Sequence, residues 1–483
     1  MTRAASQTPQ PRAEEVTSEF ELPEGWADAN LENCATSITK GSTPTSYGFK
    51  YKSSGISFVR VENLADGFID RSSISTFIDS DADEALKRSR LKAGDLLFSI
   101  AGTIGRTALV TADDLPANTN QALAVIRGTG KVFSPQFLRF SLASSLAQQQ
   151  AQSDARGGGM NNISLEDVRS LRLPVPPFAE QIRIVARVEE LLTQNKAARA
   201  RLAKVPIILK HFRQSVLAAA CSGRLTEGWR EEKRINTDQW TPATLNSVAD
   251  MRLGKMLDKS KNVGTLTRYL RNLNVRWFSF NFSDVTFLRA TPDERKELEI
   301  RDGDLFVCEG GEPGRCAVWN LGPTDIIFQK AIHRIRLEGN ISPHWVAFNI
   351  KNDADSGALE DYFTGSTIKH LTGRSLATYK FSVPPIEEQL EIVRRVEALF
   401  KLADSTEKRV EVTTKRAEKL TQAILAKAFR GELVPTEAEL ARREGREYEP
   451  ASALLERIQD EREKSTHKED NKQRRRKSDN AEN

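Results

Sequence analysis

The stretch that decides the architecture is Val175-Pro-Pro-Phe-Ala-Glu-Gln181, which returns 208 residues later as Val383-Pro-Pro-Ile-Glu-Glu-Gln389. The match continues without a gap. From Pro174 to Leu225, 18 of 52 positions are identical to the residue 208 positions further on. Chance does not hold a single register over such a span, so the chain contains an internal repeat. An ungapped match of this length also indicates a rigid element.

The repeat extends upstream into less regular sequence. Gln121 matches Gln329 at the same shift, and Gly94-Asp95 matches Gly303-Asp304 at 209. The glycine-rich stretch Gly102–Arg106 matches Gly311–Arg315, also at 209. One single-residue insertion reconciles the two halves, so the duplication includes more than the stretch around the prolines.

Each half begins with strand-rich sequence. Short β-type runs bounded by glycine, asparagine and aspartate occur at 56–61, 95–100, 122–126 and 304–307. Ser134-Pro135 and Ser342-Pro343 have the pattern of a helix start, with serine as N-cap and proline at the first helical position. The first of these helices is expected from Phe137 to about Gln152. The pattern predicts two compact α+β domains.

Each half ends in a long charged segment without glycine, 178–220 and 386–429. The second segment carries a narrow heptad seam of Val396, Ala403, Val410, Ala417 and Ile424. A helix of about 40 residues spans ~60 Å and rarely stands alone. We therefore expect the two helices to pair as an antiparallel coiled coil. Pro206 should kink or interrupt the first helix, whereas the second has Thr414 there.

The predicted fold class is α+β: a tandem duplication of a globular domain, each copy followed by a long helix. The expected boundaries are a disordered N-terminus over 1–20, a first domain over 21–177 with its helix over 178–222, a second domain over 235–385 with its helix over 386–430, and a C-terminal tail over 431–483 that is partly helical, then disordered and basic.

The composition sets few limits. A net charge of +5 permits binding to a polyanion without arguing for it. The four cysteines form no CxxC pair, so neither a zinc site nor a disulfide framework is expected. The N-terminus has no apolar signal-peptide core, and no run approaches the roughly 20 apolar residues of a membrane helix. A soluble cytoplasmic protein is expected.

A globular domain, then Pro-Pro-x-x-Glu-Gln leading into a long helix that ends near Gly-x-Leu, all repeated once, resembles the specificity subunits of Type I restriction–modification systems. Further stretches resemble that family: Lys40–Pro44, Ile56–Asn63 and Gly94–Phe98 in the first half, and Leu270–Arg276, Gly303–Phe306 and Phe429–Val434 in the second. The resemblance covers about residues 22–464.

The resemblance implies that each globular half is a target-recognition domain reading one half of a split, asymmetric site in double-stranded DNA. The paired helices would set the gap and dock two adenine-specific methyltransferase subunits. Restriction (motor) subunits would join for cleavage. The chain itself would perform no chemistry and bind no cofactor, because S-adenosylmethionine belongs to the methyltransferase subunits and ATP to the restriction subunit.

Motifs for catalysis are missing from the sequence. Val175-Pro-Pro-Phe178 differs by one residue from the Asn/Asp/Ser-Pro-Pro-aromatic motif of amino-methylating DNA methyltransferases. The valine side chain, however, has no oxygen to accept a hydrogen bond from the target amino group. No dinucleotide-binding, Walker or zinc-type motif occurs, and the five histidines have no ligand spacing. The prolines are better explained as a stiff link between domain and helix.

DNA contacts are expected from polar residues on loops of the two domains, since arginine reads guanine and asparagine or glutamine reads adenine. Residues shared by both halves should support the fold or touch phosphate, whereas loops that differ should read bases. The candidates are Arg106, Gln121, Asn161, Asn162, Lys255, Lys259, Arg315, Gln329 and Lys369. For partner docking or the domain–helix junction they are Pro176, Pro177, Gln181, Pro384, Pro385 and Gln389.

Two other functions remain open from the sequence. A coiled-coil adaptor without DNA recognition would explain the helices but not two sizeable α+β domains. A stand-alone DNA-modifying enzyme would require the motifs that are missing.

Overall fold

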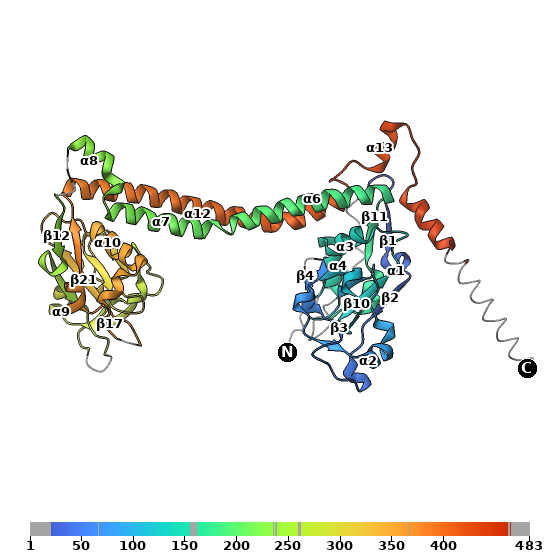
Figure 1. Cartoon of the computed structure of the whole chain (residues 1–483), viewed down its shortest axis with the longest axis horizontal. Helices are drawn as coiled ribbons and strands as arrows, with labels where there is room; N and C mark the ends of the chain where they lie inside the picture. Colours follow the sequence, from blue (N-terminus) through green and yellow to red (C-terminus); the bar gives the residue numbers. More distant parts are fainter. Residues whose placement is uncertain are drawn as a thin grey trace, which may run out of the picture. The chain divides into compact units, whose positions relative to one another are not determined.

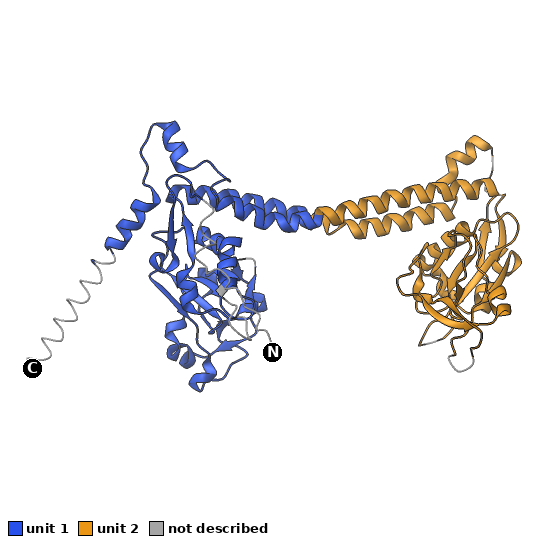
Figure 2. Cartoon of the chain, turned by 180° about the vertical axis from the view of Figure 1, so that it is seen from behind, with its two compact units in different colours: residues 1–200, 414–483 blue, residues 201–413 orange. Residues whose placement is uncertain are grey.

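The computed structural model describes residues 21–65, 67–154, 162–234, 236, 239–258, 262–365, 367–461 and 464. The chain divides into two compact units (Figure 2): residues 1–200 with 414–483, and residues 201–413. The expected N-terminal lead-in over 1–20 and the basic stretch around Arg474–Arg476 lie outside the described residues.

Unit 1 is built on a four-stranded antiparallel sheet in the order β2-β10-β7-β8. A three-stranded sheet β6-β3-β9 and the pairs β1-β11 and β4-β5 complete it. The strands are β1 Ala27–Asn30, β2 Ser37–Lys40, β3 Ile56–Val59, β4 Leu64–Ala65, β5 Phe68–Ile69, β6 Phe77–Ile78, β7 Leu96–Ser99, β8 Thr107–Leu109, β9 Ala117–Thr119, β10 Leu123–Arg127 and β11 Arg172–Val175. The α-helices before the spacer are α1 Leu31–Cys34, α2 Ser80–Ala85, α3 Pro135–Ala143, α4 Ser145–Asp154 and α5 Leu165–Ser170.

Unit 2 repeats this topology, with the sheet β13-β21-β18-β19, the sheet β17-β14-β20 and the pairs β12-β22 and β15-β16. Figure 1 labels β12, β17 and β21 of this unit. Its strands are β12 Thr241–Thr244, β13 Ala249–Leu253, β14 Thr265–Leu270, β15 Val275–Arg276, β16 Ser279–Phe280, β17 Thr286–Ala290, β18 Leu305–Cys308, β19 Cys316–Val318, β20 Ile327–Phe328, β21 Ile332–Leu337 and β22 Lys380–Val383. The shorter helices are α8 Glu227–Lys233, α9 Pro292–Glu297, α10 Pro343–Ser356 and α11 Gly373–Ala377.

The central strand of each large sheet lies between two hydrophobic cores. In β18, Leu305 and Val307 face one core while Phe306 and Cys308 face the other, and all four are buried. The alternation of side chains across a strand produces this division. It explains why the β18 sequence is apolar throughout rather than alternating.

The spacer helices are α6 Phe178–Leu202, α7 Val205–Cys221 and α12 Ile386–Ala428. In unit 1, Asn195 of α6 contacts Ala417 and Thr421 of α12, and in unit 2, Arg213 of α7 contacts Asp404 and Glu407 of α12. In unit 1 the contacts pass from Glu180–Glu437 to Asn195–Ala417, and in unit 2 from Arg213–Asp404 to Thr226–Glu388, so the residue number rises along one segment as it falls along the other. The antiparallel pairing is confirmed. Four of the five seam residues, Val396, Ala403, Ala417 and Ile424, are buried.

The interruption expected at Pro206 is confirmed: the spacer over 178–222 is two helices, because Pro206 lies in the first turn of α7 and has no N–H to continue α6. Ser134 and Ser342 are the N-caps of α3 and α10, as expected, but neither side chain makes the cap hydrogen bond; each serine N–H donates to a spacer-helix glutamine. One expectation needs correction: the helix expected over 137–152 is interrupted at Ser144, which has extended backbone dihedrals.

The segment after α12 belongs to unit 1 and is not a loose tail. It contains α13 Glu437–Glu444 and a helical stretch over 451–461. Ala451, Leu454 and Ile458 are buried in the same core as Trp26, and the Ala451 N–H donates to the Gly25 carbonyl over 2.9 Å. The first domain is therefore assembled from both ends of the chain.

Candidate nucleic-acid interface

The candidate interface of unit 2 is centred on the turn between β18 and β19, residues 309–315. Asn272, in the 3₁₀ turn Asn272–Asn274, joins the surrounding loops. Its Nδ2 donates to the Gly310 carbonyl over 3.3 Å, and its backbone N–H donates to Gln329 Oε1 over 3.3 Å. A Cβ added to Gly310 would lie 3.1 Å from His370 Nδ1, so the loop 364–370 lies directly against this turn. Four separate loops therefore meet here.

Arg315 and Arg106 hold the same turn in their two domains. Arg315 donates to the Asn272 carbonyl over 2.7 Å and to Glu312 over 3.0 Å, and its side chain is 11% exposed. Arg106 is more exposed and donates to the carbonyls of Val61 and Leu64, each over 3.4 Å. These contacts support the turn that follows β3 or β14. They give a structural reason for the arginine to recur in both halves.

Gln121 and Gln329 also occupy matching places. Gln329 accepts from Asn272 and forms a β-bridge with Lys255, while Gln121 contacts the Thr43 hydroxyl. The loops after β2 and β13, which lie against these glutamines, each begin with a glycine for a steric reason. A Cβ on Gly41 or Gly254 would come within 2.3 Å of carbonyl oxygens, of 119–120 and 328–329 respectively. The backbone thus brings the loop after β2 or β13 to the same place in each domain.

The two loops held in this way differ in chemistry. In the first domain the loop is polar and contains a short 3₁₀ turn, Pro44–Tyr47, with Tyr47 58% exposed. In the second domain Met256 and Leu257 are exposed, and the amino group of Lys255 is paired with Glu294. Lys259 lies outside the described residues. Among the described residues, a common frame therefore exposes Tyr47 in one domain and Met256 and Leu257 in the other.

The remaining candidates lie in the loops that border the central turn. The loop 364–370 is closed by a pair of backbone hydrogen bonds between Thr364 and His370, 2.8 and 2.9 Å long. Lys369 lies on this loop, half-exposed, and is paired with Glu360 over 2.5 Å. In unit 1, Asn162 forms a β-bridge with Ala101 beside the turn equivalent to 309–315. Asn161 lies outside the described residues.

Lys255, Arg315 and Lys369 are all engaged with carboxylates, so a phosphate would have to compete with those partners. Sequence reasoning missed Asn272, which joins the loops, and exposed Lys330, whose backbone N–H donates to the Lys255 carbonyl. The sequence signal for Lys330 is its position next to Gln329. For Asn272 it is its place within the family-like stretch Leu270–Arg276.

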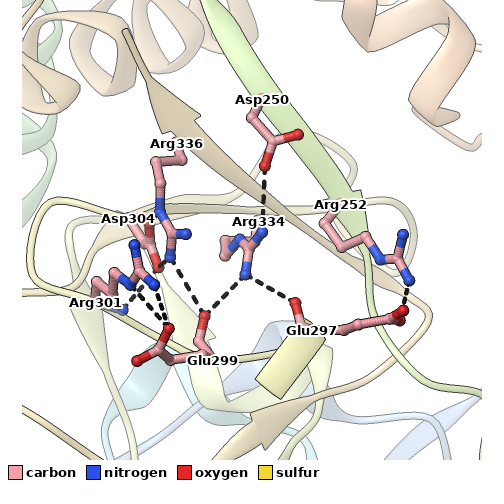
Figure 3. A network of polar contacts seen from close by, with 8 residues as sticks. All are labelled: Asp250, Arg252, Glu297, Glu299, Arg301, Asp304, Arg334 and Arg336. Atoms are coloured by element: carbon pink, nitrogen blue, oxygen red, sulfur yellow. Dashed lines mark hydrogen bonds and ion pairs between the residues drawn. The ribbon is translucent and has the colours of Figure 1, made fainter. Parts of the chain in front are cut away.

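Away from these loops, a large charged cluster in unit 2 is structural (Figure 3). Arg334, buried on β21, donates to the carbonyls of Glu297 and Glu299 and to Asp250. Burial lowers its pKa from the ordinary arginine value. Beside it, Arg336 forms a bidentate pair with buried Asp304. Arg127 and Asp95 make the same pair in unit 1, so this pair is part of the repeated scaffold.

The junction between each domain and its spacer helix is held by a buried glutamine that makes three hydrogen bonds to backbone groups. Gln181 accepts from the Ser134 N–H over 2.9 Å and donates to the carbonyls of Val132 and Pro176. Gln389 makes the matching bonds with Ser342, Asn340 and Pro384. Both glutamines are fully buried; Pro176, Pro177 and Pro384 are buried, and Pro385 is half-buried. These candidates lie in the domain–helix junction, and only Pro385 among them is partly exposed.

Beside each glutamine is a buried glutamate that accepts a hydrogen bond from a tryptophan indole N–H. Trp26 donates to Glu180 and Trp240 to Glu388, each over 2.9 Å. Glu388 also accepts from Thr226 over 2.7 Å and pairs with Arg230 over 2.5 Å. Glu180 accepts instead from the backbone N–H of Glu437 over 2.8 Å. Burial raises the pKa of Glu180, against the lowering effect of these hydrogen bonds.

Within the described residues, no group of three His, Cys, Asp or Glu side chains is placed to hold a metal ion. In the same residues, no helix is long and apolar enough to cross a membrane.

Comparison with known proteins gives consistent matches. The family model for the Type I restriction modification DNA specificity domain matches twice, at residues 23–206 and 237–414. The chain is 29% identical over 432 residues to the Type I restriction enzyme EcoKI specificity subunit of Escherichia coli K12, covering 85% of this chain and 90% of that protein. It is 27% identical to the StySPI specificity subunit of Salmonella potsdam, with the same coverage.

Among solved structures, the HsdS subunit from Thermoanaerobacter tengcongensis has the same fold. The TM-score is 0.62 at 21% identity, and the match covers 86% of this chain and 99% of that one. A chain from a study of complex assembly and conformational transition of the type I R-M system gives a TM-score of 0.63 at 20% identity, over 86% and 100%. The repeated domain, its spacer helices and the two family matches show that this chain belongs to the family of Type I restriction–modification DNA specificity proteins.

Proposed function

We propose that this chain supplies the DNA sequence specificity of a Type I restriction–modification complex by reading a two-part, asymmetric site, one half with each domain. The observation that carries the proposal is the contrast between the two loops beside Gln121 and Gln329. A repeated scaffold holds them at the same place, yet one loop exposes Tyr47 and the other exposes Met256 and Leu257. Two readers of different half-sites require this combination.

The proposal includes partners. Ile182 and Leu390, at matching positions near the starts of α6 and α12, are 50% and 58% exposed, beside fully buried Gln181 and Gln389. Two similar apolar positions, one in each half, would suit two copies of one partner, and we assign them to two methyltransferase subunits. Restriction subunits would join the complex for cleavage. S-adenosylmethionine and ATP would be bound by these partners, and the chain would act in the cytoplasm without catalysing a reaction.

The proposal is tested by single-molecule sequencing of host DNA for methyladenine, with this gene intact and deleted. We expect deletion to remove one split motif, which also identifies both half-sites. An unchanged methylation pattern, with the methyltransferase expressed, would instead favour an adaptor without DNA recognition. Methylation by the purified chain alone would contradict a non-catalytic role.

The assignment of the loops has a matched test. Tyr47→Ala and Met256→Ala are expected to relax base preference in one half of the motif each, and in different halves. Each lost base contact should reduce discrimination at its position by roughly tenfold. Equal relaxation of both halves by either variant would show that these loops do not read bases separately.

A further inference from the structure

The hairpin β15-β16 of unit 2 contains an unusual turn. Its two strands pair Val275 with Phe280 and Arg276 with Ser279, which leaves Trp277 and Phe278 as a two-residue turn. Phe278 has a φ of +60°, in the left-handed region that side chains other than glycine disfavour. At the matching turn of the first domain the sequence is Asp66-Gly67, and Gly67 has a φ of +90°. Asp-Gly is an ordinary choice for such a hairpin, and Trp-Phe is not.

Strained backbone persists when the surrounding contacts fix it. The Phe278 ring packs on two helices: on Phe348 of α10 with ring centroids 5.5 Å apart, and on Phe400 of α12 at 5.9 Å. The Phe278 N–H donates to the Cys316 carbonyl of β19 over 2.9 Å. In the first domain the matching space is different, because Gly67 lies against the Arg139 side chain. The strained residue in unit 2 therefore joins the recognition domain to its spacer helix.

The same turn also reaches the candidate interface. The Trp277 indole N–H donates to Glu312 Oε1 over 2.6 Å, and the amino group of Lys351 lies over the Trp277 ring at 4.7 Å. Glu312 in turn accepts from Arg315, which holds the Asn272 carbonyl. A continuous series of contacts thus runs from Phe400 on the spacer helix, through the strained turn, to the loops that meet at residues 309–315.

We propose that Phe278, Trp277 and Phe400 form an aromatic latch that fixes the angle of the second recognition surface on α12, and thereby the gap length accepted between half-sites. Phe278 and Phe400 are positioning residues, since neither lies in the candidate interface itself. The inference rests on the proposed function for its consequence in DNA recognition. The mechanical part, coupling of Phe400 to the turn 309–315, stands independently of it.

The mechanical part is tested by amide hydrogen exchange in the full chain. The amides of Gly314 and Arg315 are bonded to the carbonyls of Cys308 and Glu312. Phe400→Ala should speed their exchange roughly threefold to tenfold, the range corresponding to an aromatic pair. Phe282→Ala is the matched control, because Phe282 packs on Phe280 and Trp319 of the same unit. Unchanged exchange in Phe400→Ala, or equal effects of both variants, would overturn the latch.

The functional part uses the chain co-expressed with its methyltransferase partner. Methylation is compared on DNA carrying the native gap and on DNA with a gap one base pair longer or shorter. We expect Phe278→Gly and Phe400→Ala each to lower discrimination between gap lengths threefold to tenfold. The double variant should lose no more discrimination than either single variant. Phe400→Tyr, which keeps an aromatic ring, should keep the wild-type discrimination. If Phe278→Gly does not fold, the Phe400 variants decide alone.

Wild-type discrimination in the Phe400→Ala variant, or additive effects in the double variant, would refute the latch as a positioning device. Absence of any two-part methylated sequence with the wild-type chain would instead refute the proposed function, while the exchange experiment would still test the latch.

Discussion

Each of the two domain–helix junctions has a buried glutamate that accepts a hydrogen bond from a tryptophan, but the second partner of the carboxylate differs between them. In unit 2, Glu388 is paired with Arg230, which follows the first spacer helix. In unit 1, Glu180 receives a backbone N–H from Glu437, which follows α12. Each junction is therefore closed by the segment that comes after the other half's helix. The repeat conserves the glutamate, whereas its partner depends on the segment that closes the junction.

The largest expected difference comes from removing the segment that closes unit 1. A chain ending at Pro435 loses buried Leu454 and Ile458, each worth about 1.5–3 kcal/mol, together with the Glu437 contacts. We expect unit 1 to lose about 5 kcal/mol or more while unit 2 keeps its stability, measured by hydrogen exchange resolved by unit. A chain ending at Lys464 is the control. Equal loss in both units would show that the segment does not belong to unit 1.

The next effect is expected at the charged junction. Arg230→Ala leaves Glu388, which has no exposed surface, without its cation. Breaking a buried pair from one side costs about 3–5 kcal/mol, so the denaturation midpoint of unit 2 should fall while that of unit 1 does not. Exposed Arg224→Ala is the control. The additional change Glu388→Gln should recover part of the loss, and no recovery would mean that Arg230 acts through packing.

A smaller effect is expected in the helical seam. Asn195 is buried and donates to the Ala417 carbonyl, whereas the matching position in α12 is buried Ala403. Asn195→Ala should cost about 1 kcal/mol in urea unfolding of unit 1, as for a typical hydrogen bond. A gain in stability would indicate that the amide is kept to fix helix register instead.

The smallest effect concerns pH. Because burial raises the pKa of Glu180, this group favours the folded state most at pH values below its unfolded pKa. That contribution is lost as pH rises through the raised value. The stability of the wild-type chain relative to Glu180→Gln should therefore fall between the ordinary glutamate range and the raised pKa. Unfolding of unit 1 as a function of pH measures this difference, and a rise over that window would contradict the sign.

Sequence reasoning could predict the elements whose signals are periodic or repeated. The buried strands at 96–99 and 305–308, and the helical seam from Val396 to Ile424, follow from apolar patterns that local physics constrains. The repeat located both junctions, but not the partners of Glu180 and Glu388. These partners are distant in sequence, and nothing local distinguishes Arg230 from the exposed arginines around it.

The candidate interface was predictable only in outline. The glycines and glutamines that frame it recur in both halves and could be found by alignment of the chain with itself. Asn272 could not, because its role depends on three loops brought together by the fold. Phe278 was also missed, since a positive φ at an aromatic residue arises from tertiary packing against the preference of the residue.

The contribution of residues 414–461 to unit 1 has a consequence for biosynthesis. A ribosome that has released residues 1–200 must add more than 200 further residues before the N-terminal domain has its complete core. At 5–20 residues per second, this delay is roughly 10–50 s. Unit 2, contained in 201–413, can be completed first. The domain that begins synthesis first is thus the last to finish folding, and its exposed core during that interval is a target for chaperones and proteases.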